Sequence, residues 1–306
     1  MSEMIPDIKA TADTVVHFLF ASPGNEDLLL SLINAVLVDA GHPPVAKVTV
    51  RNPFNPKTFL ADKDSILDIK AEDEHGKTFT IEFQVAEHDA FVNRILYYWA
   101  KCYTGQLQKG NPYQKLQPVV SIVVVEFPLF PELTKLHNTF YIMAQDEPEY
   151  VLTEDLQIHT LELTKEKWRQ IPMLVEPLRG WLELLYLADK KPETEMKVLL
   201  KNDQTLERAY SEYQRFTQDA SLRELEEARQ KFLHDQATRE LSAEKKGREE
   251  ERIENLLQVL AKRVGKVPPT VRDKLLAIHD LGVLRQLMDV AWDCQTLGEF
   301  EEALSK

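Results

Sequence analysis

Residues 65–84 read SILDIKAEDEHGKTFTIEFQ, and this stretch decides the fold of the first half of the chain. Apolar and polar residues alternate on both sides of a polar turn that contains Gly76. A period of two on either side of a glycine-containing turn is typical of a β-hairpin. Side chains two positions apart share one face of a strand, so we expect Glu82 and Gln84 to point away from the face that carries Ile81.

The hairpin also brings acidic side chains together. If its strands pair about a centre near Gly76, Asp68 falls opposite Glu82 or Gln84. Two carboxylates that converge repel each other unless a cation lies between them. A hard divalent ion with oxygen ligands is the usual solution, and Mg²⁺ typically takes one or two carboxylates together with water and a phosphate. Taken alone, however, these three residues are more typical of an ordinary polar hairpin face.

Further motifs accompany the hairpin in a fixed order along the chain. They are Thr11-Ala12-Asp13, Phe18-Leu19-Phe20, Leu32-Ile33-Asn34-Ala35-Val36-Leu37, Asp62-Lys63, Arg94-Ile95-Leu96-Tyr97-Tyr98, Gln106-Leu107 and Pro118-Val119-Val120-Ser121-Ile122. Together with Asp68 and the E-x-Q motif of Glu82 and Gln84, these motifs span residues 8–165. In this order they resemble the Rpn family of recombination-promoting nucleases, also described as PD-(D/E)XK nuclease family transposases.

The resemblance implies both a fold and an activity. The fold is α/β, a PD-(D/E)XK restriction-endonuclease-like core with a mixed sheet, followed by an all-helical C-terminal half. The activity is that of a metal-dependent DNA endonuclease that hydrolyses phosphodiester bonds and promotes recombination, DNA mobilisation or defence. In such a site Asp68 and Glu82 bind Mg²⁺, with Mn²⁺ or Ca²⁺ as alternatives. An acid on the first helix often joins them, which makes Asp13 a further candidate ligand or, more simply, a solvated helix residue.

Gln84 and Lys63 are candidates for handling the attacking water and the phosphate. Gln84 stands where the E-x-K form of the motif has a lysine. A neutral amide can orient a water molecule by hydrogen bonds, but it adds no positive charge. Lys63 precedes the hairpin and either lies near the phosphate or pairs in water with Asp62 or Asp64.

Arg94 is the other basic candidate, because it follows closely after Gln84 at the start of a predicted helix. A guanidinium there can hold a scissile phosphate with two hydrogen bonds. The alternative is a salt bridge to Glu87 or Asp89.

The composition limits the class of protein. The net charge of −13 and the pI of about 5.2 do not suit a protein that coats DNA, because non-specific affinity comes from basic side chains, but they allow a local basic groove. Two distant cysteines cannot build a disulfide framework, which favours a reducing compartment. We find no signal peptide and no apolar run long enough for a bilayer, so we expect a cytoplasmic protein without membrane contact.

The other segments predict helices over residues 8–20, 26–39 and 87–109 and strands over residues 45–50, 118–127, 139–144 and 157–163. The near-continuous apolar run at 118–127 is typical of a central strand that is buried on both faces. We therefore expect a nuclease-like domain over residues 1–165, a helical extension over 166–248 and a small helical domain over 249–306.

The helical half has a sparse apolar face and no candidate catalytic cluster. A partner or a second copy of the chain would help to cover such a face, so we predict a homodimer through residues 170–306. The acidic balance also keeps open an alternative, an inactive nuclease-like protein that binds or regulates through this half. A basic groove beside Asp68 and Glu82 would favour the nuclease over that alternative.

Overall fold

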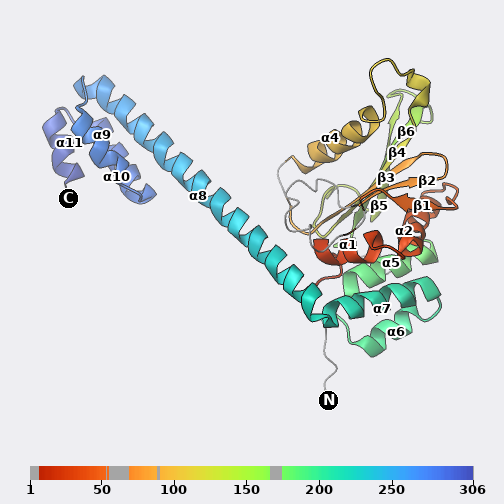
Figure 1. The fold of residues 1–306 in the computed structure, drawn as a ribbon. Coiled ribbons are helices and arrows are strands. Elements are labelled where there is room, and N and C mark those ends of the chain that lie inside the picture. Colours follow the sequence, from red (N-terminus) through yellow and green to blue (C-terminus); the bar gives the residue numbers. More distant parts are fainter. Residues whose placement is uncertain (1–6, 53, 55–68, 88–89, 166–173, 306) are drawn as a thin grey trace. The chain divides into compact units, whose positions relative to one another are not determined.

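The computed structural model describes residues 7–52, 54, 69–87, 90–165 and 174–305 (Figure 1). The chain forms two compact units that divide between Arg229 and Gln230. The first unit contains a β-sheet with helices packed on it, and the second unit is helical. Among the described residues, no helix combines the length and the apolar character needed to cross a membrane.

A mixed sheet forms the centre of the first unit, and its strand order is β1-β2-β3-β4-β6-β5. The strands are β1 (Val48–Val50), β2 (Ile69–Asp73), β3 (Thr78–Gln84), β4 (Val119–Val125), β5 (His137–Met143) and β6 (Val151–Glu162). β4 runs parallel to both β3 and β6, whereas the pairs β1–β2, β2–β3 and β5–β6 are antiparallel. All residues of β4 are buried, as a central strand between two helix layers requires. The predicted α/β fold with a mixed sheet is confirmed.

The predicted hairpin is formed by β2 and β3. Ile69 pairs with Ile81, and the turn between the strands contains Gly76 at a positive φ of 86°. The side chain of Asp73 closes this turn, because its Oδ1 accepts hydrogen bonds of 2.8 Å from the backbone nitrogens of both His75 and Lys77. The turn therefore fixes the register of the hairpin.

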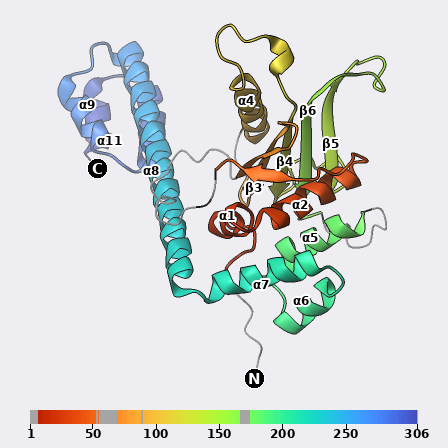
Figure 2. The same ribbon diagram turned by 45° about the vertical axis from the view of Figure 1, so that its right-hand side comes forward.

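Helices cover both faces of the sheet (Figure 2). One face packs against α1 (Asp13–Ala21) and α2 (Glu26–Asp39), and α5 (Glu176–Leu187) packs against α2. The other face packs against α4 (Phe91–Thr104), and a short 3-10 helix, η1 (Tyr113–Lys115), precedes β4. Ile81 and Ile122 belong to the first core, whereas Val123 and Val125 belong to the second. Successive residues of a strand therefore point alternately into the first core and toward the face that carries the second core.

α6 (Glu193–Leu200) and α7 (Gln204–Gln218) also belong to the first unit. Phe216 on α7 packs against Phe18 on α1, with ring centroids 5.3 Å apart. The apolar faces of α5 and α7 are buried in this chain's own core, whereas Val198 and Leu199 on α6 are exposed. The compact unit consequently continues beyond the domain boundary expected at residue 165.

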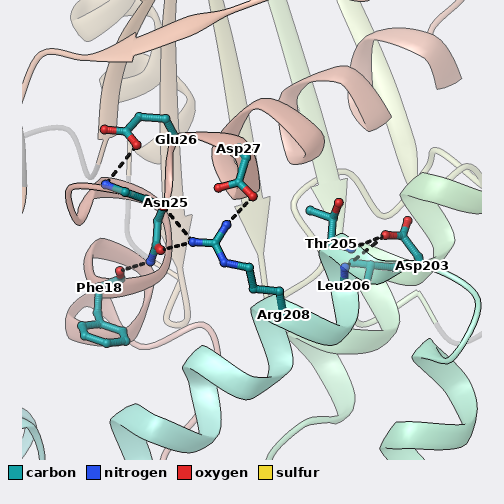
Figure 3. A network of polar contacts seen from close by, with 9 residues as sticks. Phe18, Asn25, Glu26, Asp27, Asp203, Thr205, Leu206 and Arg208 are labelled. Carbon is teal, nitrogen blue, oxygen red and sulfur yellow. Dashed lines mark hydrogen bonds and ion pairs between the residues drawn. The ribbon is translucent and has the colours of Figure 1, made fainter.

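A polar network holds α7 in place (Figure 3). Arg208 donates to Asp27, to Asn25 Oδ1 over 2.7 Å and to the carbonyl oxygen of Gly24 over 2.7 Å. Asp203 caps the start of α7 by accepting hydrogen bonds from the backbone nitrogens of the first turn. One arginine therefore ties α7 to the turn between α1 and α2.

The last helices are α8 (Ala220–Val264), which is 45 residues long, followed by α9 (Pro269–Leu276), α10 (Leu281–Asp293) and α11 (Leu297–Leu304). The C-terminal part of α8 and the three short helices share a core of their own, which includes Leu256, Leu260 and Phe300. Asp280 and Thr296 accept hydrogen bonds from backbone nitrogens at the starts of α10 and α11. This core corresponds to the leucine-rich pattern at the end of the sequence.

Candidate active site

Glu82 and Gln84 lie on β3, on the face of the sheet that α4 covers. Their positions in the parallel ladder are opposite Val123 and Val125, and both valines belong to the core beneath α4. Glu82 is 6% exposed, which is rare for a carboxylate because removing its charge from water is costly. The charged form of this buried acid therefore needs a compensating cation.

Arg94 on α4 supplies that cation. Its Nη2 donates to Glu82 Oε1 and also to Gln84 Oε1, the second bond being 2.8 Å long. Gln84 Nε2 in turn donates to the carbonyl oxygen of Ala86 over 3.1 Å, which turns the amide oxygen of Gln84 toward Arg94. Two side-chain oxygens from one strand thus converge on a single positively charged nitrogen.

The chain conformation before α4 directs Arg94 to this place. Ala90 adopts a left-handed conformation with φ 61°, and its carbonyl accepts the first hydrogen bond of the helix from the backbone nitrogen of Arg94 over 3.0 Å. The guanidinium lies 5.0 Å from the ring centroid of Phe91, which packs into the core beneath α4. The position of Arg94 is therefore fixed by both the backbone and an aromatic ring.

Three influences act on the charge of Glu82. Burial raises the pKa of its carboxyl, the charge and hydrogen bond of Arg94 lower this pKa, and the negative charge of Asp13 raises it again. The balance leaves the pKa above its ordinary value. The effect of Asp13 also shows that the two carboxylates are close enough to interact electrostatically.

Asp13 is the first residue of α1, and an arginine holds it as well. Arg229 on α8 donates to Asp13 Oδ2 from Nε over 3.0 Å and from Nη2 over 2.6 Å. Among the described residues, Asp13 Oδ1 and Glu82 Oε2 have no hydrogen-bond partner. In each acid, therefore, one carboxylate oxygen accepts hydrogen bonds from an arginine and the other has no partner among the described residues.

Only some of the predicted site residues can be placed in the structure. It brings Glu82, Gln84 and Arg94 into one cluster, and Arg94 pairs with Glu82 instead of the alternative partner Glu87. The predicted residues Asp68 and Lys63 lie outside the described residues. Arg229 could not be found from the sequence, because no local pattern relates a residue of α8 to one of α1.

The oxygens of this cluster suit a hard divalent cation such as Mg²⁺. Glu82 and Gln84 already direct two oxygens at one cationic nitrogen, and Asp13 adds negative charge nearby. Within the described part of the chain, no group of three or more His, Cys, Asp or Glu residues is arranged to hold a metal.

Comparison with known proteins identifies the family. The profile described as "PD-(D/E)XK nuclease family transposase" matches residues 10–243, which is more than half of the chain. Neither a curated protein nor a solved structure matches. The match covers the sheet, α4 and α5 to α7, and it ends within α8. Nucleases with the PD-(D/E)XK motif generally use divalent metal ions. The chain belongs to the PD-(D/E)XK nuclease family transposases.

Proposed function

We propose that the protein is a metal-dependent DNA endonuclease. The observation that carries this proposal is the convergence of Glu82 and Gln84 on the cationic Nη2 of Arg94, in a chain of a nuclease family. Buried oxygens that already face a positive charge are suited to hold a metal cation. The family description suggests recombination or DNA mobilisation as the biological setting.

We assign the metal to Asp68 and Glu82, with Asp13 as a further ligand. Asp68 directly precedes Ile69, which pairs with Ile81, the neighbour of Glu82 in the sequence. This position next to Ile69 in the sequence is the reason for choosing Asp68 as the partner of Glu82 in the proposed site. Mg²⁺ is the ion proposed, with Mn²⁺ or Ca²⁺ as alternatives. When bound, such an ion polarises the scissile phosphate and lowers the pKa of a water molecule that attacks it.

Gln84 and Arg94 then share the task of the lysine in the E-x-K motif. Gln84 cannot supply positive charge, but its oxygen binds the guanidinium of Arg94 over 2.8 Å. Arg94 therefore brings positive charge to the position beside Glu82. A planar guanidinium can also bind two phosphate oxygens at once. Lys63 is proposed as a second phosphate contact because it precedes the hairpin in sequence.

A second candidate function is binding or regulation without cleavage. Two observations favour it, namely that Glu82 and Asp13 are both neutralised by arginines and that the chain carries a net charge of −13. In such a protein Arg94 and Arg229 would take the place of a metal permanently. The two functions differ in whether a divalent ion binds and whether DNA is cut.

Cleavage of plasmid DNA tests the proposal. Purified full-length protein is incubated with supercoiled plasmid and Mg²⁺, Mn²⁺, Ca²⁺ or EDTA. The nuclease proposal expects nicked or linear DNA with Mg²⁺ or Mn²⁺ and intact DNA with EDTA. Intact plasmid under every condition would reject cleavage and favour the binding protein.

A further inference from the structure

The first turns of α8 make three polar contacts with residues 7–14 near the start of the chain. Arg223 binds Asp7, Glu226 accepts a hydrogen bond from Thr14, and Arg229 binds Asp13. The three α8 residues are spaced three apart, so they lie near one another on the helix surface. α8 is therefore attached to the start of α1, where one of the candidate metal ligands lies.

The two arginines make different ion pairs. Arg223 donates to both oxygens of Asp7, each over 3.0 Å, and the Asp7 side chain is 71% exposed. Arg229 donates twice to Oδ2 of Asp13, and the Asp13 side chain is only 28% exposed. The Arg229 pair is thus less screened by water, and it leaves Oδ1 of Asp13 without a partner among the described residues.

This arrangement is typical of the outer partner of a metal ligand. A ligating carboxylate is commonly held by a hydrogen bond on one side while its other oxygen faces the metal, and the partner fixes its direction. The negative charge of Asp13 raises the pKa of Glu82, so Asp13 lies within electrostatic range of the candidate site. Arg229 also offsets part of the repulsion between the two acids.

We propose that Arg229 is a positioning residue of the nuclease site, because it holds Asp13 with one carboxylate oxygen open toward a divalent cation. The inference rests on the proposed function, since it assigns Asp13 to the metal. It also assigns a role to the helical extension: the first turns of α8 complete the site. The family match supports this role, because it continues through Arg229 to residue 243.

Metal binding without DNA tests the inference. Mn²⁺ is titrated into the full chain, and free Mn²⁺ is followed by electron paramagnetic resonance. Loss of an outer partner typically weakens metal binding by about 10-fold or more, and we expect this for Arg229→Gln. Arg223→Gln is the matched control, because it removes an arginine pair from the same face of α8 without touching Asp13. It should bind Mn²⁺ as the wild type does.

The variants also separate positioning from general damage. In an Asp13→Asn background, Arg229→Gln should cause no further loss of Mn²⁺ affinity, because the inference has Arg229 act on the metal through Asp13. A folded Arg229→Gln variant with unchanged or tighter Mn²⁺ binding would overturn the inference and leave the nuclease proposal standing. A wild type that binds no Mn²⁺ would overturn both.

Hydrogen exchange of the wild-type chain gives a second readout that needs no variant to fold. If Arg229 and the metal hold Asp13 together, Mn²⁺ should slow amide exchange in the first turns of α8, around residues 223–229. The competing possibility is that Mn²⁺ displaces Arg229. In that case exchange there would rise, and faster or unchanged exchange would contradict the inference.

Discussion

Arg94 on α4 is bound to Glu82 on β3, and its guanidinium is the only arginine or lysine charge that the described part of the chain places on this acid. The Glu82 side chain is 8% exposed, whereas that of Arg94 is 35% exposed. The pair therefore sits at the boundary of the sheet's second core, with the acid inside and the base reaching toward water. This geometry makes the charge of Glu82 dependent on one removable partner.

We first predict that Arg94→Met destabilises the fold. The substitution keeps most of the apolar length of the side chain but leaves a buried acid without its partner. Such a loss costs roughly 1–3 kcal/mol, and the partial exposure of Arg94 places the expected value toward the lower end. Urea unfolding measures the change, and adding Glu82→Gln should recover much of it because the charge itself is then removed.

Arg51→Met is the control for this prediction. Arg51 pairs with Glu72 on the same sheet, but this pair is exposed and should contribute less than about 1 kcal/mol. Equal losses of stability in Arg94→Met and Arg51→Met would argue that burial of Glu82 has no energetic consequence.

A second prediction concerns pH. His159 on β6 is fully buried, and its Nδ1 lies 3.0 Å from His137 Nε2, while His137 Nδ1 lies 2.6 Å from Asp39 Oδ2. Burial, together with the nearby His137 and His42, lowers the pKa of His159 from 6.5 to about 3. Between these values the unfolded chain binds a proton that the folded chain does not.

The stabilisation from a neutral His159 is therefore complete above pH 6.5 and is lost as the pH falls below this value. The loss is at most about 1.4 kcal/mol for each pH unit. Urea unfolding above and below pH 6.5 measures it, and His159→Gln should reduce the dependence on pH. His75→Gln, which changes an exposed turn residue, is the control variant, and equal curves for all three proteins would refute the assignment.

A third prediction tests the packing of α5 on α7. A methyl group added at Gly180 would overlap with the side chain of Leu206, which is buried. Gly180→Ala should therefore destabilise the fold by about 1–3 kcal/mol, although alanine favours a helix. Gly247 in α8 has open space around it, so Gly247→Ala should stabilise α8 by up to about 1 kcal/mol. Thermal unfolding distinguishes the two, and a stabilised Gly180→Ala would contradict the packing.

The features that could be predicted from the sequence are those that depend on a local pattern of residues. The alternation around Gly76 predicted the β2–β3 hairpin, and the helix expected over residues 26–39 has the same bounds in α2. Glu82 and Gln84 share a face because side chains in a strand alternate. These features depend on neighbouring residues alone, which is why they could be predicted before the fold was known.

The parts that could not be predicted depend on contacts between distant segments. The partner of Asp13 is Arg229, from a helix more than half of the chain away. The composition of residues 192–247 predicts largely exposed helices, yet Tyr213 and Phe216 are fully buried in the first unit. A sparse apolar face in a sequence does not indicate which surface will cover it. Here tertiary packing against the first unit buries these residues.

A fourth prediction concerns assembly. Because the apolar faces of α5 and α7 are buried in the first unit, we predict that a dimer contact in the helical half depends on residues 230–306. Trp292 in this unit is 58% exposed and Val283 is 41% exposed, although ten other residues there form a core. Light scattering should show a dimer for the full chain and a monomer after deletion of residues 230–306. A full chain that stays monomeric at micromolar concentration would refute the dimer.

The most direct test of the nuclease proposal compares two acids of the same hairpin. Glu82→Gln removes the proposed metal ligand, whereas Glu72→Gln removes an acid of β2 whose partner is Arg51. Cleavage of supercoiled plasmid with Mg²⁺ is measured for both variants and the wild type, after circular dichroism shows that all three are folded. The account predicts that Glu82→Gln falls to the level seen with EDTA while Glu72→Gln cuts like the wild type. Full cleavage by folded Glu82→Gln would contradict it.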